Sequence, residues 1–224
     1  MAIMAHQFPG GPAQIPRPTK LYHITAIENL QSILARQYIL SYSKLSQEET
    51  AHTNIAYNHI QDRRAKKRVP CGPGGVLHDY VPFYFAPRSP MLHAIWKGKV
   101  PDYPRGQSSV IYLVSSVEVV QEAGLEFVFT DGHGTMDFSG YFDDPTRLDC
   151  IDWRLMNDKL WRNTEDDNDR SRRRQAEFLV HQRFPLELLL GIAVIDATLK
   201  AEVKSLLADA GREIEVRVVR QYYY

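Results

Sequence analysis

The chain has 224 residues, of which 44% are hydrophobic and 24% are charged, and its formal net charge at pH 7 is zero. This length is enough to bury the core of one large domain, and the neutral balance excludes a global attraction to nucleic acid or membranes, so any such binding needs a local patch. The only cysteines are Cys71 and Cys150, which excludes a four-thiolate metal site and a disulfide scaffold and favours a reducing, cytoplasmic location.

The N-terminal residues 1–19 are rich in proline and glycine and lack the apolar core of a signal peptide. We therefore expect a flexible segment over 1–19, followed by a single domain over 20–224. No apolar run approaches the roughly 18 residues that cross a bilayer, so no membrane-spanning segment is expected.

The first expected elements are a strand and a helix that follows it directly. "LYHIT" (21–25) has the composition of a short strand, and apolar residues then recur at helical spacing over 27–34. Thr25 is followed three residues later by Glu28, which is a capping-box pattern and predicts that the helix begins at Thr25.

A basic segment over 44–79 interrupts the regular pattern. The elements expected on either side of it and within it are a strand over 38–43, a helix within 54–68, a Gly/Pro turn over 70–75, a strand over 80–85 and a helix over 88–98.

The second half contains a long irregular stretch, 131–176, that mixes aromatic residues with charges of both signs. We interpret it as a partly ordered substrate-recognition loop. The elements expected around it are strands over 108–116 and 125–130 with a helical turn between them, a strand beginning at Glu177, a strand over 188–196, a helix over 198–210 and a strand over 213–219. Many strands with few helices predict an α+β fold with a mixed or mostly antiparallel sheet.

Glu177 stands out in "RRRQAEFLVHQRFP" (172–185), between three arginines and a strand-like apolar run. Period-two alternation puts Ala176, Phe178 and Val180 on one face of this strand, and Glu177 on the other face together with Leu179 and His181. The plain structural alternative is an edge-strand glutamate paired with a neighbouring arginine, which is a common and weak interaction.

Two further residues combine with Glu177. His23 in "YHIT" and Tyr84 in "FYFAPRS" each have a structural alternative, as a satisfied strand histidine and as a sheet-core aromatic. Considered together, His23, Tyr84 and Glu177 resemble the H-Y-E signature of the ADP-ribosyltransferase fold. That resemblance implies a split, mixed or antiparallel β-sheet core with flanking helices.

Three longer blocks make the resemblance more specific. "IQDRRAKKRVPCGPGGVLHDYVPFYFAPRSPML", "FVFTDGHG" and "RRRQAEFLVH" resemble the DarT family of DNA-modifying toxins, over about residues 20 to 222. The resemblance implies an enzyme that transfers ADP-ribose from NAD⁺ to a base in single-stranded DNA within a short sequence motif. Thymine, at N3, is the base that most of the family modifies, and relatives of the same fold use guanine. The resemblance also implies a partner, the antitoxin DarG, a macrodomain ADP-ribosyl-hydrolase.

The resemblance assigns roles to the residues of the NAD⁺ site. Tyr84 would stack on the nicotinamide ring and His23 would bond the adenosine ribose. The remaining residues implied to bind the dinucleotide are Ile24, Thr25, Leu40 and Arg64. Glu177 is implied as the catalytic carboxylate, because a fixed charge at the ribose 2′-hydroxyl stabilises positive charge that develops as nicotinamide leaves.

Arg64 is the second catalytic residue that the resemblance implies. Helical spacing agrees, because Ala56, Ile60 and Arg64 share one i, i+4 row whereas Arg63 and Lys67 share a neighbouring row. A guanidinium stays protonated, so stabilising the anion of the target base suits it better than acting as a simple base.

The remaining basic residues are interpreted as contacts to DNA phosphates. They are Arg63, Lys66, Lys67 and Arg68 in the basic segment, and Arg172, Arg173 and Arg174 before Glu177. "TDGHG" (130–134) is interpreted as a tight turn. Its Asp131 and His133 could also form a proton relay, but two side chains alone do not hold a metal, and no metal is expected.

Two alternatives remain open at this stage. One is a transferase of the same fold that acts on guanine, RNA or protein. The other is a catalytically inactive nucleic-acid-binding module that uses the 63–68 patch and the loop aromatics.

Overall fold

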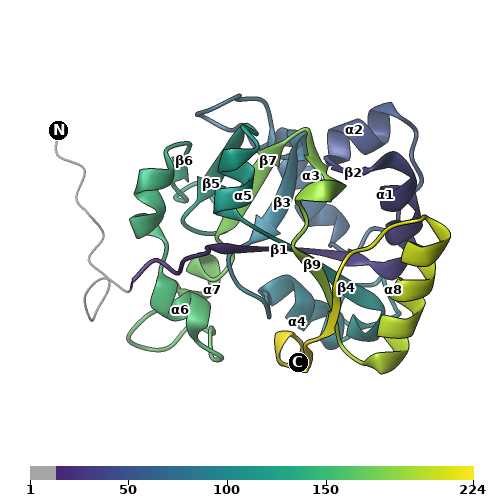
Figure 1. The fold of residues 1–224 in the computed structure, drawn as a ribbon. Coiled ribbons are helices and arrows are strands. Elements are labelled where there is room, and N and C mark those ends of the chain that lie inside the picture. The colour runs from purple at the N-terminus through teal and green to yellow at the C-terminus, as the bar shows by residue number, and fades with distance from the viewer. Residues whose placement is uncertain (1–13) are drawn as a thin grey trace.

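The computed structural model describes residues 14–224, and an eight-stranded sheet with strand order β10-β9-β4-β1-β3-β7-β5-β6 forms its centre (Figure 1). A second sheet pairs β2 with β8. The strands are β1 Lys20–Ala26, β2 Tyr38–Leu40, β3 Tyr80–Tyr84, β4 Val110–Ser116, β5 Phe127–Thr130, β6 Tyr141–Phe142, β7 Glu177–His181, β8 Arg183–Pro185, β9 Gly191–Val194 and β10 Val216–Val218. The α-helices are α1 Leu30–Arg36, α2 Tyr42–Gln47, α3 Asn58–Lys66, α4 Pro90–Trp96, α5 Val117–Glu122, α6 Trp153–Asn157, α7 Arg170–Arg173 and α8 Ala197–Asp209.

Most neighbouring strands of the large sheet run antiparallel, and β9 and β10 are the parallel pair. Parallel neighbours need a crossover, and α8 provides it between β9 and β10. The expected α+β class with a mixed, mostly antiparallel sheet is confirmed.

The main hydrophobic core lies on one face of the sheet. The strands contribute buried residues such as Phe83, Ile111 and Phe178, and helices α1, α5, α6 and α8 pack their apolar residues against them. Burial of a side chain such as Phe178 contributes about 1.5–3 kcal/mol. On other strand faces, Tyr22 and Ile24 pack with α4 and the C-terminal segment. These layers fix the positions of β1, β3 and β7, which are neighbours in the sheet.

The helix after β1 begins later than the sequence predicted. The strand continues to Ala26, and a 3₁₀ turn over Ile27–Asn29 precedes α1. Thr25 is not a helix cap, because its Oγ1 accepts a hydrogen bond from Asn29 Nδ2 at 2.9 Å. Glu28 forms an ion pair with Arg105. The predicted capping box is therefore wrong, because the Thr25 hydroxyl is hydrogen-bonded to Asn29 and the Glu28 carboxylate is paired with Arg105.

Two strand predictions also needed correction. The strand expected over 38–43 ends at Leu40, because Ser41 caps α2 by accepting a hydrogen bond from the Lys44 backbone N–H. Strand β8 was not expected. Gln182 has a positive φ of 59°, and the chain turns there, out of the large sheet, to pair with β2.

The N-terminal expectation lies largely outside the residues that the structure describes, since 1–13 are not among them. Within 14–19, Thr19 is fully buried and its backbone N–H donates to both carboxylate oxygens of Glu118. Thr19 is therefore already part of the folded domain. Within residues 14–224, no helix is long and apolar enough to cross a bilayer.

Candidate active site

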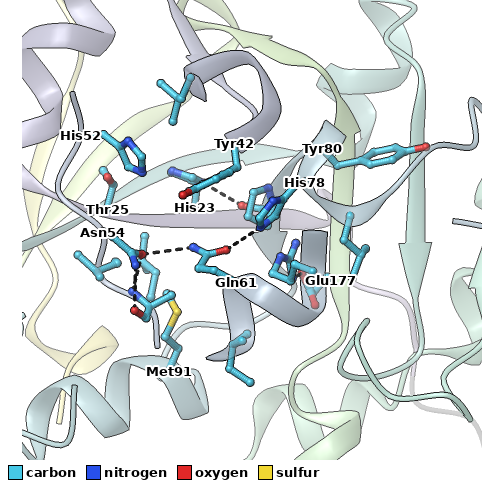
Figure 2. A pocket seen from close by; sticks show the side chains of 18 of the residues that line it. His23, Thr25, Tyr42, His52, Asn54, Gln61, His78, Tyr80, Met91 and Glu177 are labelled. Atoms are coloured by element: carbon cyan, nitrogen blue, oxygen red, sulfur yellow. Dashed lines mark hydrogen bonds and ion pairs between the residues drawn. The ribbon is translucent and has the colours of Figure 1, made fainter. Parts of the chain in front are cut away.

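A cavity of about 510 Å³ is lined by all three residues of the H-Y-E pattern, and Figure 2 shows two of them, His23 and Glu177, at its wall. His23 reaches it from β1, Tyr84 from the end of β3 and Glu177 from the start of β7. This volume is within the range of small-molecule and cofactor sites.

Sheet pairing explains how residues so far apart in the chain meet. In the antiparallel pair β3–β7, Tyr84 is directly opposite Glu177, and on its other side Tyr84 is opposite Tyr22 of β1. Directly opposed side chains on one face of a sheet lie about 5 Å apart. Because β7 lies between β3 and β5, Glu177 is not on an edge strand, and the edge-strand alternative is wrong.

Glu177 is buried, with 4% of its surface exposed. One carboxylate oxygen, Oε2, accepts a hydrogen bond from Arg64 Nη1 at 2.7 Å, and Oε1 accepts one from the Gly134 backbone N–H at 3.1 Å. A buried carboxylate is tolerated only when it is paired and hydrogen-bonded. Each oxygen can accept more than one hydrogen bond, so the carboxylate retains the capacity to bind a ligand hydroxyl.

Arg64 lies on the inward side of α3, as its helical row predicted, and its side chain is 12% exposed. Burial acts to lower the pKa of the guanidinium, but the charge and hydrogen bond of Glu177 outweigh it and raise that pKa above its ordinary value. Arg64 is therefore a permanent cation. Its second terminal nitrogen, Nη2, is buried and has no hydrogen-bond partner among residues 14–224.

The turn 130–134 forms a support for Glu177. Thr130 Oγ1 donates to the Gly132 carbonyl at 2.6 Å and accepts from the Glu177 backbone N–H at 3.1 Å. A Cβ at Gly134 would lie 3.1 Å from Glu177 Oε1 and 3.3 Å from a Leu77 methyl group. A Cβ here would be in tight contact with both groups, so glycine lets the backbone N–H approach the carboxylate without displacing them.

Asp131 and His133, the two titratable residues of this turn, do not form a relay with each other. Asp131 pairs with Arg172, whereas His133 Nδ1 accepts a hydrogen bond from the Thr135 backbone N–H at 3.2 Å. Burial and the charges of Arg64 and Arg63 lower the pKa of His133, so this cavity-lining ring is neutral and holds its proton on Nε2. Of residues 14–224, no group of three or more His, Cys, Asp or Glu side chains could hold a metal ion.

His23 and Tyr84 are both uncharged at the cavity. His23 Nδ1 donates to the Pro82 carbonyl at 2.8 Å, and burial lowers the pKa of its ring, so Nε2 is left as an acceptor. Burial, with the nearby charge of Glu177, raises the pKa of the Tyr84 phenol. The other expected dinucleotide-binding residues, Ile24, Thr25 and Leu40, also line the cavity.

Sequence reasoning missed a polar network on the cavity wall (Figure 2). Tyr42 stacks on His78 with 4.2 Å between ring centroids, His78 Nε2 is 3.1 Å from Gln61 Oε1, and Gln61 Nε2 donates to Asn54 Oδ1 at 3.2 Å. These residues come from α2, α3 and the connecting segments of the basic region. That region has no apolar period that would have grouped them.

The basic residues of α3 and the following segment divide into two kinds. Arg63 donates to the Thr135 carbonyl at 3.1 Å, and Lys67 pairs with Asp137 at 2.7 Å, so both contact the 131–176 loop. Lys66 and Arg68 are exposed.

The three arginines before Glu177 do not form the open phosphate-binding face that we expected. Arg174 is 3% exposed and donates to carbonyl groups, including that of Pro87 at 2.7 Å. Arg172 pairs with Asp131 and Asp169, and the ion-pair partners of Arg173 are Asp152, Asp167 and Asp169. The interpretation as DNA contacts is corrected accordingly: these guanidinium groups are occupied in holding the 131–176 loop, as buried charges must be paired.

A mostly antiparallel split sheet that presents His, Tyr and Glu from three neighbouring strands to one cavity defines an ADP-ribosyltransferase. Comparison with known families agrees, because residues 22–224 match the family described as "ssDNA thymidine ADP-ribosyltransferase, DarT". The chain belongs to the DarT family. The fold, the enzyme class and the dependence on NAD⁺ that the sequence predicted are thereby confirmed.

Individual relatives cover nearly the whole chain. A DNA ADP-ribosyl transferase of Thermus aquaticus is 45% identical over 211 residues, which are 93% of this chain and 90% of the relative. The structure of Thermus sp. 2.9 DarT in complex with ADP-ribosylated ssDNA matches with a TM-score of 0.89 at 40% identity, over 95% of this chain and all of the other. The same protein in complex with NAD⁺ matches with a TM-score of 0.84 at 38% identity, over 94% of this chain and all of the other.

Proposed function

We propose that this enzyme transfers the ADP-ribosyl group of NAD⁺ to N3 of a thymine in single-stranded DNA, within a short sequence motif, and so blocks DNA replication. The observation that carries the proposal is the ion pair between Arg64 and Glu177, which lies in the cavity beside Tyr84. It places a carboxylate and a permanent cation side by side. The first half of the reaction needs the negative charge, and the second half needs the positive charge.

NAD⁺ would bind along the cavity without a Rossmann-type glycine motif. His23 Nε2, an acceptor, receives a hydrogen bond from the adenosine ribose, and Ile24, Thr25 and Leu40 hold the dinucleotide beside it. The neutral Tyr84 ring stacks on the nicotinamide. Glu177 accepts a hydrogen bond from the 2′-hydroxyl of the nicotinamide ribose, which orients the sugar.

In the first half of the reaction, the bond between the ribose anomeric carbon and the nicotinamide nitrogen breaks. The electron pair leaves with nicotinamide, which departs as a neutral molecule, and the sugar gains oxocarbenium character. The Glu177 carboxylate is fixed by Arg64 and Gly134, so it stabilises this positive charge without having to reorganise.

In the second half, thymine N3 attacks the anomeric carbon and loses its proton. Arg64 stabilises the developing base anion through Nη2, which has no partner among residues 14–224, and the proton passes to Glu177. Arg64 does not act as the base, because the raised pKa of its guanidinium keeps it charged.

The DNA backbone would cross the exposed side of α3. Lys66 at the end of α3 and Arg68 just after the helix are exposed, and Arg63 and Lys67 lie next to them in the chain. These residues hold phosphates and carry no sequence information. Arg172, Arg173 and Arg174 would instead contribute indirectly, by fixing the position of the 131–176 loop.

We also propose the cellular setting that the family implies. Both Cys71 and Cys150 are free thiols, which suits a reducing cytoplasm. The partner would be an antitoxin of the DarG type, whose macrodomain removes ADP-ribose from DNA. Residues 20–224 would act as one domain.

The test is intact-mass analysis of synthetic oligonucleotides incubated with the enzyme and NAD⁺. We expect a mass increase of one ADP-ribosyl group on single-stranded DNA containing thymine in a suitable context. Replacing thymine by uracil, which keeps N3, should preserve modification, and replacement by N3-methylthymine should abolish it. Modification of guanine, of RNA of the same sequence or of added protein in its place would contradict the proposed substrate. Glu177→Gln is the inactive control.

A further inference from the structure

Helix α4 has an exposed face that the proposed reaction does not use. Pro90, Met91 and Ala94 line the cavity, whereas Trp96, on the far side of the helix, is 43% exposed. The C-terminus lies beside α4 (Figure 1), and the Tyr224 ring stacks on Trp96 with 5.5 Å between centroids and 21° between planes. We call the exposed residues of this face the α4 platform. They are Trp96, Lys97, Lys99 and Arg162, and the half-buried His93 lies among them.

The Tyr224 ring beneath Trp96 is held by several hydrogen bonds. Tyr224 Oη accepts a hydrogen bond from Trp161 Nε1 at 2.6 Å and donates to the Arg88 carbonyl. Gln107 bonds both the backbone N–H and the carbonyl of Tyr224. Because these contacts already hold the aromatic pair, a ligand that stacks on Trp96 orders few additional side chains.

Positive charge surrounds the exposed indole. Lys97 Nζ lies 3.9 Å from the Trp96 ring centroid, and Arg162 Nη2 lies 3.3 Å from His93 Nε2. Burial and the charges of Arg162, Lys97 and Lys99 lower the pKa of His93. Within residues 14–224, none of these three cations forms an ion pair with a carboxylate.

We propose that the α4 platform binds the stretch of single-stranded DNA that flanks the target base, with a base stacked on Trp96 and phosphates held by the platform's cations. An aromatic ring among unpaired cations is the combination that binds single strands with little sequence preference. A phosphate would draw the flexible Lys97 ammonium off the indole and free the ring face for a base. Opposite sides of an α-helix are about 10 Å apart, a distance that a short extended strand spans from the cavity to Trp96.

The inference rests on the proposed function. It is tested by comparing the binding of short and extended oligonucleotides. A short oligonucleotide carries only the target base and its immediate neighbours, and longer ones extend it on the 5′ or the 3′ side. Dissociation constants are measured by fluorescence anisotropy. We expect Trp96→Ala to weaken binding of one extended oligonucleotide at least about fivefold, which is the lower end of the usual strength of base–aromatic stacking, and to leave the short one unchanged. Trp96→Phe, which keeps a ring, should restore most of the affinity.

The cations are tested separately. The triple variant Lys97→Ala, Lys99→Ala and Arg162→Ala should reduce the slope of log K against log salt by about 2 for the extended oligonucleotide, at about 0.7 for each phosphate contact with a single strand. Lys204→Ala, an exposed charge on α8, is the matched control and should change nothing. Hydrolysis of NAD⁺ without DNA should be unchanged in all these variants.

Two results would overturn the inference. If Trp96→Ala binds short and extended oligonucleotides as the wild type does, the platform does not contact DNA. If Trp96→Ala weakens binding of short and extended oligonucleotides equally, Trp96 affects the cavity through Tyr224 and does not contact the flanking DNA. Failure of the proposed function is a different result, because the wild-type enzyme would then modify none of the oligonucleotides, whatever their length.

Discussion

Arg64 and Glu177 are 113 positions apart in the chain and are joined by a buried hydrogen-bonded ion pair of 2.7 Å. Removing one member of a buried pair leaves the other charge unpaired, which typically costs 3–5 kcal/mol, on the order of half the stability of a domain. Variants at this pair must therefore separate loss of chemistry from loss of fold, and shape-conserving substitutions do this best.

Glu177→Gln should abolish transfer while NAD⁺ still binds. The amide keeps the shape of the side chain, and its single oxygen can accept the hydrogen bond of Arg64 or of Gly134 while its NH2 group faces the other donor. It lacks the charge that stabilises the oxocarbenium ion. We expect kcat to fall at least about 100-fold, with a small change in the affinity for NAD⁺. Single-turnover assays and calorimetric titration measure the two quantities. A variant that modifies DNA within tenfold of wild type would refute the role of Glu177.

Arg64→Lys should lose DNA modification and retain some slow hydrolysis of NAD⁺. A lysine ammonium can pair with Glu177 but cannot also present the second donor of the guanidinium fork to the target base. Arg63→Ala, on the neighbouring helical row, should be much milder, because Arg63 donates to the Thr135 carbonyl and does not contact Glu177. Product formation and nicotinamide release are measured in parallel. If Arg63 proves essential and Arg64 dispensable, the assignment of the activating residue is wrong.

Thr130→Val should lower kcat through the position of Glu177. The Thr130 hydroxyl is buried and bonds both the Gly132 carbonyl and the Glu177 backbone N–H, so valine leaves two buried polar groups unpaired. We expect about a 10-fold or larger loss in kcat, together with a lower melting temperature. Thr130→Ser, which keeps the hydroxyl, should restore the rate. Equal activity of the valine and serine variants would show that the hydroxyl has no positioning role.

Replacing Lys66 and Arg68 together by alanine should weaken DNA binding to the same extent for all sequences, and should reduce the salt slope by about 1.4 for two phosphate contacts. Both side chains are exposed, so the fold should be unaffected. Filter binding across a salt series is the measurement. An unchanged slope would place the DNA path away from α3.

The stability of the enzyme should fall as the pH drops below about 6.5. Burial lowers the pKa of His23, His78 and His133 from the ordinary value of 6.5, so the unfolded chain binds protons more readily than the folded one. The contribution of these histidines to the unfolding free energy is then fully present above pH 6.5. It declines as the pH falls below 6.5 towards the lowered pKa values of the folded state. Urea titrations between pH 7.5 and 5 test this, and substitution of His78 by glutamine should flatten the decline. An unfolding free energy that rises on acidification would contradict the expectation.

The sequence by itself indicated most of the elements, and its resemblance to a known family indicated the chemical class. Period-two alternation put Glu177 and Phe178 on opposite faces of a strand, and Phe178 lies in the main core while Glu177 lines the cavity. Helical spacing agreed with the family resemblance in selecting Arg64 over Arg63 as the inward-facing arginine. These patterns are local, since each depends on the geometry of one element.

Only the tertiary structure decided which partners the charged and polar side chains have. Arg172, Arg173 and Arg174 look like an open cationic run in the sequence, yet Arg172 and Arg173 form ion pairs with aspartates of the 131–176 loop, and Arg174 donates to backbone carbonyls that include that of Pro87. Thr25 and Glu28 match a capping box in the sequence, yet in the structure Thr25 is hydrogen-bonded to Asn29 and Glu28 is paired with Arg105. A polar side chain has several possible partners of similar energy in water, and only the packing of distant elements selects one of them.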